Sequence, residues 1–82
     1  MRAFLTALQI PQKSAQEWVK EGIALYGFKQ YEEAIAAYDQ AIRLNPNYAD
    51  AYNNKGLALD QFGRKREAQQ AYEKAKQLGY GS

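Results

Sequence analysis

The sequence predicts an all-α fold, in which antiparallel helix–turn–helix repeats stack side by side as a short array. Two observations carry this prediction. The chain repeats itself at an offset of 34 residues, and each copy contains two stretches with apolar residues at helical spacing. The 82 residues therefore divide into a first repeat at 15–48, a second repeat at 49–82 and an N-terminal apolar segment at 1–14.

The internal repeat is defined by identical residues in the two copies. When 15–48 is laid over 49–82, 11 of the 34 positions agree. The identical pairs are Ala15/Ala49, Gly22/Gly56, Ala24/Ala58, Leu25/Leu59, Phe28/Phe62, Glu33/Glu67, Ala34/Ala68, Ala37/Ala71, Tyr38/Tyr72, Ala41/Ala75 and Leu44/Leu78. So many agreements in one register indicate that both copies fold in the same way.

Each copy is predicted to contain two helices separated by turn-forming residues. The expected helices are 15–28 and 31–44 in the first repeat, and 49–62 and 65–78 in the second. Residues 27–30 and Gly63 are expected to form the turns within the repeats. The segment 45–47, Asn-Pro-Asn, ends one helix before the next begins, and Gly79 is expected as the C′ residue of the last helix.

Small and polar residues at matched positions predict contacts between the helices. Gly22, Ala34, Gly56 and Ala68 allow two helix backbones to approach closely. Lys55 aligns with Glu21 in the 34-residue register, so we expect the two to pair across adjacent first helices. A partly exposed pair of this kind contributes only about 0–1 kcal/mol.

These residues resemble the tetratricopeptide repeat. Its pattern is met in the first copy by Trp18, Gly22, Ala34, Tyr38, Ala41 and Pro46, and in the second by Tyr52, Gly56, Ala68, Tyr72 and Ala75. The copies depart from it at five residues: Glu21 and Lys55 replace a Leu, Leu25 and Leu59 replace a Tyr, and Tyr80 replaces the second Pro. The resemblance implies a right-handed superhelical array with a concave face, lined by the first helix of each repeat, that holds a peptide or a helix of a partner protein.

The second repeat differs from the first on the outer side of its second helix. Three apolar residues of the first repeat are polar in the second: Tyr31, Ile35 and Ile42 become Lys65, Gln69 and Lys76. A middle repeat packs these positions on its neighbour, whereas a terminal repeat exposes them. We therefore expect the second repeat to be C-terminal in the array, with a polar outer face.

The N-terminal segment 1–14 is open to three interpretations. Phe4, Leu5, Leu8 and Ile10 are apolar, and 2–9 is long enough for two helical turns before Pro11. The segment is expected to cap the first repeat, to insert into a groove of this chain or of a neighbour, or to be disordered. Two repeats are fewer than the roughly three usually needed for stability, which favours a supporting role.

Composition argues against several classes of function. The chain has no Cys and no His, so it lacks disulfides, zinc fingers and the usual nucleophile–base pairs. Its carboxylates form no converging pair, and we expect neither enzymatic activity nor a cofactor or metal. The net charge is +2, and Arg64–Lys65–Arg66 is interpreted as a solvated helix start, so nucleic acid is not expected as a partner. No run of residues is apolar and long enough to span a membrane, and the expected location is the cytoplasm.

The remaining class of function is recognition of another protein. Mapped by repeat position, the concave face that the resemblance implies contains Val19, Lys20, Ile23, Tyr26, Asn53, Asn54, Leu57, Asp60 and Gln61. The apolar members form a strip, and the two Asn amides offer donors and an acceptor to a peptide backbone. Two alternatives stay open: these are the exposed side chains of a scaffold, or the main activity is self-association into a dimer or segment-swapped oligomer.

Overall fold

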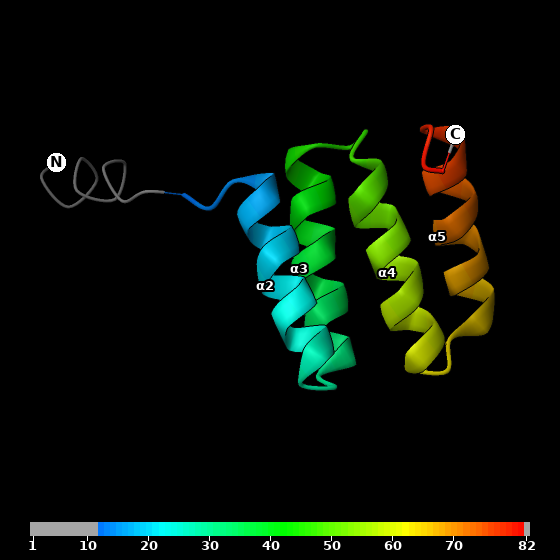
Figure 1. Cartoon of the computed structure of the whole chain (residues 1–82), viewed down its shortest axis with the longest axis horizontal. Helices are drawn as coiled ribbons and strands as arrows, with labels where there is room; N and C mark the ends of the chain where they lie inside the picture. The colour runs from blue at the N-terminus through cyan, green and yellow to red at the C-terminus, as the bar shows by residue number, and fades with distance from the viewer. Residues whose placement is uncertain (1–11, 82) are drawn as a thin grey trace, which may run out of the picture.

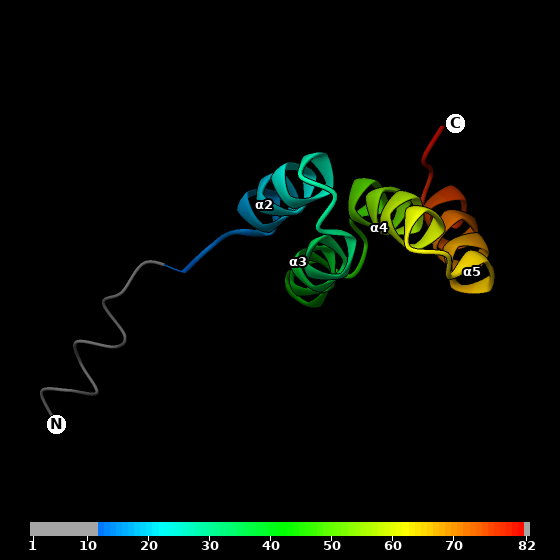
Figure 2. The same cartoon turned by 90° about the horizontal axis from the view of Figure 1, so that it is seen from below.

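The computed structural model describes residues 12–81 as two helical hairpins placed side by side (Figure 1). The helices are α2 (Ala15–Gly27), α3 (Tyr31–Leu44), α4 (Ala49–Gln61) and α5 (Lys65–Gln77). Seen from below, α2 and α4 form one row and α3 and α5 the other (Figure 2). The all-α prediction is confirmed. Residues 1–11 lie outside the described residues. The three interpretations of the N-terminal segment therefore stay predictions.

The helices end one residue earlier than predicted in three of four cases. Phe28, Phe62 and Leu78 are C-caps, whose backbone N–H groups still donate to carbonyls of the preceding turn. Gly63 and Gly79 follow with positive φ angles of 92° and 102°. Together with the two bonds that close each turn, this is the Schellman motif. The predicted turn at Gly63 and the predicted C′ role of Gly79 are thus confirmed.

The turn between α2 and α3 uses a lysine where the second repeat uses glycine. Lys29 has φ 62°, the left-handed conformation, and it aligns with Gly63. Its N–H donates to the Tyr26 carbonyl and that of Gln30 to the Leu25 carbonyl, at 2.9 Å each. The first repeat therefore adopts the same turn with a residue whose Cβ makes the left-handed conformation less favourable than it is for glycine.

Helix α2 begins with a reciprocal cap. The Ser14 hydroxyl accepts from the Glu17 N–H at 3.1 Å, and a Glu17 carboxylate oxygen accepts from the Ser14 N–H at 2.8 Å. These hydrogen bonds hold the pKa of the Glu17 carboxyl below its usual value. The capping box fixes where the first repeat starts.

The core consists mainly of alanines with a few large side chains. Tyr38 and Leu59 are the largest fully buried residues, at 2% and 1% exposure. The buried cluster is contiguous through all four helices, which makes the two repeats one folding unit. Its members are Val19, Ala34, Ile35, Tyr38, Ala41, Ala51, Ala58, Leu59, Ala68 and Ala71.

Matched positions on α3 and α5 have different environments. Ile35 is buried in the core cluster, whereas Gln69, its counterpart on α5, is exposed. Lys65 and Lys76 are exposed as well. Tyr31 and Ile42 are half-buried. The apolar residues of α3 are thus more buried than their polar counterparts on α5, and the difference is greatest at Ile35.

Candidate functional site

The concave-face residues of the sequence analysis lie on α2 and α4, the two helices of one row (Figure 2). Ile23 and Leu57 occupy matched repeat positions and are 52% and 41% exposed. Asn53 and Asn54 are half-buried, and within residues 12–81 their side chains form no hydrogen bond. We call the accessible members of this group the inner face: Lys20, Ile23, Tyr26, Asn53, Asn54, Leu57 and Gln61.

Two other predicted residues are engaged within the protein. Val19 is only 6% exposed and belongs to the core cluster, so it supports the inner face from beneath. The Asp60 carboxylate pairs with Lys65 Nζ at 2.7 Å, and its other oxygen accepts from the Tyr72 hydroxyl at 3.5 Å. Burial, first, and then this neighbouring carboxylate raise the pKa of Tyr72. Asp60 therefore links α4 to α5 at the turn.

An aromatic pair takes the place of this ion pair in the first repeat. Tyr26 and Tyr31 align with Asp60 and Lys65, and their rings meet edge-on with centroids 5.3 Å apart. Both pairs bridge the first helix and the start of the second. Tyr26 thus has its ring packed at the turn, at one end of the inner face.

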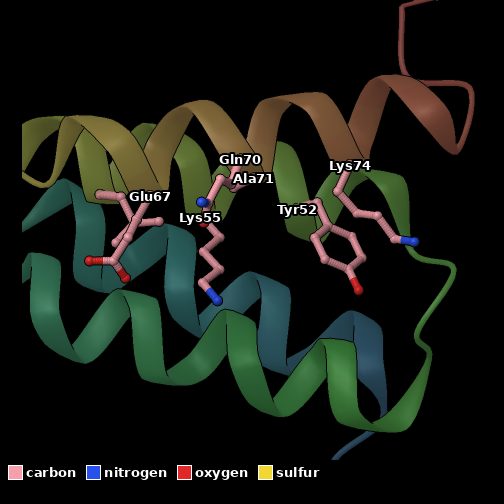
Figure 3. A pocket seen from close by; sticks show the side chains of 7 residues that line it. Tyr52, Lys55, Glu67, Gln70, Ala71 and Lys74 are labelled. Carbon is pink, nitrogen blue, oxygen red and sulfur yellow. The ribbon is translucent and has the colours of Figure 1, made fainter.

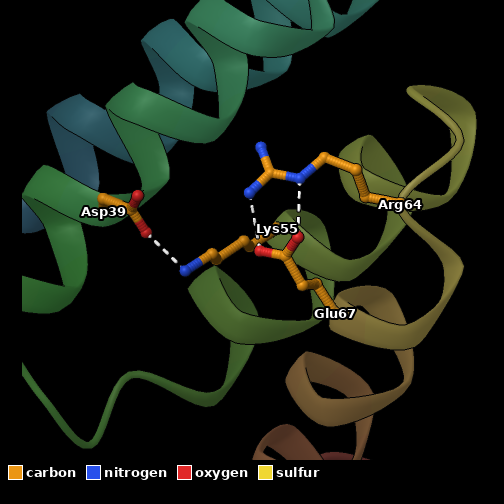
Figure 4. A network of polar contacts seen from close by, with 4 residues as sticks. All are labelled: Asp39, Lys55, Arg64 and Glu67. Carbon is orange, nitrogen blue, oxygen red and sulfur yellow. Dashed lines mark hydrogen bonds and ion pairs between the residues drawn. The ribbon is translucent and has the colours of Figure 1, made fainter.

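The predicted ion pair between Lys55 and Glu21 is wrong. Lys55 Nζ instead pairs with Asp39 Oδ1 of α3 at 2.7 Å (Figure 4), while Glu21 pairs with Lys13. The reason is the packing of the helices, because α4 lies against α5 and α3 and has few contacts with α2. Lys55 therefore pairs with a carboxylate of α3 and not with its matched residue on α2.

Charged residues of α3, α4 and α5 gather around Lys55 (Figure 4). Arg64 donates to both Glu67 carboxylate oxygens, with Nε–Oε1 at 2.7 Å and Nη2–Oε2 at 2.6 Å. This fork lowers the pKa of the Glu67 carboxyl and raises that of the Arg64 guanidinium. With Lys65 bound to Asp60, two of the three cations in Arg64–Lys65–Arg66 are paired with carboxylates.

A pocket of about 180 Å³ opens between α4 and α5, on the side that faces α3 (Figure 3). We call it the α4–α5 pocket. It is lined by Tyr52, Lys55, Leu59, Glu67, Gln70, Ala71 and Lys74. At 3.6 residues per turn, its α4 residues lie on the opposite side of that helix from Asn53, Asn54 and Leu57.

Sequence reasoning missed this pocket, although one signal pointed to it. Lys55 stands where the repeat pattern has Leu, and the structure places that lysine in the pocket wall. A charged residue at a position that is usually apolar indicates that its side chain is solvent-accessible or has a polar partner. The 34-residue register instead predicted that Lys55 pairs with Glu21 across adjacent first helices.

Within residues 12–81, no group of three acidic side chains is arranged to hold a metal ion. Over the same residues, no helix combines the length and the apolar character needed to cross a bilayer.

The repeat architecture agrees with comparisons to known families. A family model described as TPR repeat matches residues 22–63, half of the chain, and a second, described as tetratricopeptide repeat, matches residues 49–78. A comparison with curated proteins finds no match. The matched ranges include Gly22 and Gly56, where the backbone of each first helix lies close to the ring of Tyr38 or Tyr72. The chain belongs to the tetratricopeptide repeat family.

Proposed function

We propose that the chain binds a peptide or a helix of a partner protein across the inner face, without catalysing a reaction. Tetratricopeptide repeats are in general protein–protein interaction modules, which gives the broad class of function. The proposal for this chain is that α2 and α4 provide the binding surface.

The supporting observation is the exposure of Ile23 and Leu57 at matched positions of these helices. Ile and Leu at such exposures leave apolar area in water, and covering it is favourable by about 25 cal/mol for each Å² removed. Asn53 and Asn54 lie on the same side of α4 as Leu57, and their amides have no partner within residues 12–81. An apolar strip beside free amides is a surface that a peptide recognises by side chain and by backbone together.

The proposal is tested by selecting peptides from a random display library on the full chain and measuring their affinity for variants. Leu57→Ala and Asn54→Glu change the inner face at accessible positions, whereas Lys76→Ala is a matched control on α5. We expect both inner-face variants to weaken binding severalfold and the control to leave it unchanged, with thermal unfolding similar in all three. Equal affinity of selected peptides for wild type, Leu57→Ala and Asn54→Glu would contradict the proposal.

Self-association is a second candidate, supported by a different observation. Phe28 and Phe62 are the C-caps of α2 and α4, and they are 78% and 45% exposed. Both helices end at the same edge of the molecule (Figure 1). Sedimentation across a concentration series tests this candidate, with Phe28→Ser expected to reduce association. A strictly monomeric chain at high concentration would exclude it.

A further inference from the structure

The α4–α5 pocket has an apolar floor and a polar rim. Leu59 and Ala71 line it and are 1% and 7% exposed, so they form its base. Tyr52, Gln70 and Lys74 surround the opening, and their side chains border the space between α5 and α3 in Figure 3. None of these three rim side chains has a hydrogen-bond partner within residues 12–81.

The size of the pocket limits what it holds. Sites for cofactors and drug-sized ligands measure about 300–1,000 Å³, well above the 180 Å³ found here. A cavity of about 150 Å³ is already sufficient for a benzene ring. The volume therefore matches one aromatic or branched aliphatic side chain.

The charged residues of the pocket determine which residue is favoured next to a bound apolar side chain. Three charged residues line it, and two of them are already neutralised: Lys55 by Asp39, and Glu67 by Arg64. Lys74 has no carboxylate partner within residues 12–81. The pocket thus offers one uncompensated positive charge at its rim.

We propose that the α4–α5 pocket docks a segment of a partner protein, with one aromatic or branched apolar side chain on Leu59 and Ala71 and an adjacent Asp or Glu paired with Lys74. This surface lies on the side of α4 opposite the inner face. A partner that uses it is bound independently of a peptide on the inner face, so one chain joins two proteins.

Charge complementarity distinguishes this occupant from the chain's own N-terminal segment. Residues 1–11 contain apolar side chains and Arg2, and no Asp or Glu. That segment would bring a second cation towards Lys74. A segment with an acidic residue fits the rim, and the N-terminal segment does not.

The experiment is an NMR titration of the ¹⁵N-labelled full chain with two capped dipeptides. Acetyl-Phe-Asp-amide is the probe, and acetyl-Phe-Asn-amide is its neutral analogue. We expect the Asp peptide to shift the amide signals of Tyr52, Gln70, Ala71 and Lys74. The Asn peptide is expected to bind more weakly by up to about fivefold, the range of an exposed ion pair.

Two variants of α5 separate the role of Lys74 from general electrostatics. Lys74→Glu and Lys76→Glu change the net charge equally, and both residues are exposed, but only Lys74 lines the pocket. We expect Lys74→Glu to remove the preference for the Asp peptide and Lys76→Glu to retain it.

Several results would overturn the proposal. These are equal effects of the two variants, equal binding of the two peptides, or no shift at the solubility limit of the Asp peptide. Shifts confined to Ile23, Asn54 and Leu57 would also contradict it while supporting the inner-face function. Nuclear Overhauser contacts from Phe4 to the pocket, or pocket signals that depend on protein concentration alone, would assign the pocket to the chain's own segment or to a second copy.

Discussion

Gly22 and Gly56 are the positions at which the first helix of each repeat meets a tyrosine ring. A Cβ added at Gly22 would lie 2.8 Å from Cδ1 and Cζ of Tyr38, and one at Gly56 would lie 2.6 Å from Cε1 of Tyr72. The same contact occurs twice, but the two rings differ in freedom. Tyr38 is 2% exposed, whereas Tyr72 is half-buried, so only Tyr72 has space to move aside.

Substitution of these glycines by alanine is expected to have unequal effects. Overpacking a filled core costs about 1–3 kcal/mol, and the better helix propensity of Ala offsets at most about 1 kcal/mol. We expect Gly22→Ala to lower the free energy of unfolding by about 1–2 kcal/mol and Gly56→Ala by less. Urea denaturation measures both, and Gly27→Ala is the control because, beyond its chain neighbours and its own helix backbone, nothing lies within 4 Å of the added Cβ. A loss at Gly27 as large as that at Gly22 would contradict this explanation.

The Tyr38 hydroxyl makes the fold sensitive to alkali. Burial, first, and then the neighbouring Tyr26 raise the pKa of Tyr38 from 10.0 to about 12. A raised pKa means that the folded state holds the proton more tightly than the unfolded state does. The resulting stabilisation is complete below pH 10 and is lost as the pH rises from about 10 to about 12.

Tyr38→Phe is expected to flatten the alkaline part of the stability curve. The variant keeps the ring against Gly22 and removes the ionisable group, so its urea midpoint should fall less steeply between pH 9.5 and pH 11.5. Tyr80→Phe serves as the matched control, since Tyr80 is exposed at 42%. Parallel curves for wild type and Tyr38→Phe would show that other groups cause the alkaline loss.

At the scale of the helices, the repeat in the sequence predicted the helix boundaries well and the contacts between helices less well. The starts of all four helices and the end of α3 agree with the prediction, because turn residues and apolar periodicity are local signals. The partner of Lys55 was missed, because a 34-residue register identifies equivalent residues without telling which helix lies opposite them. The burial of Val19 was missed for the same reason, since a position on a repeat does not by itself give its exposure.

The pairing of Lys55 with Asp39 is testable by a double-mutant cycle. Lys55→Met and Asp39→Asn remove the two charges, and their coupling in the free energy of unfolding should be about 0.2–1 kcal/mol and should decrease with added salt. The side chains of Lys55 and Asp39 are 28% and 49% exposed, so solvent screens the pair. A parallel cycle with Lys55→Met and Glu21→Gln should give no coupling. Coupling to Glu21 rather than to Asp39 would restore the pairing that the sequence register predicts.

At the scale of the whole molecule, the array is thin and its stability depends on the junction between the repeats. The structure measures 47 × 27 × 17 Å, and its buried side chains are largely alanines. A core of small side chains gains little from burial within one hairpin. Helices α3 and α4 form the junction between the hairpins. We therefore expect their buried residues, Ile35 on α3 and Ala51, Ala58 and Leu59 on α4, to contribute disproportionately to the stability of both.

The importance of the junction is tested by exchanging matched residues between α3 and α5. Ile35→Gln places the polar residue of the second repeat in the buried junction, and we expect a loss of at least about 2 kcal/mol from lost burial and an unsatisfied amide. Gln69→Ile makes the reverse change on the exposed side of α5, where the free energy of unfolding should change by less than about 0.5 kcal/mol. That second variant adds apolar surface to the outer side of the array, so it should instead promote association in sedimentation experiments at high concentration. If the two variants lost equal stability, burial at the junction could not explain why one repeat has Ile at this position and the other has Gln.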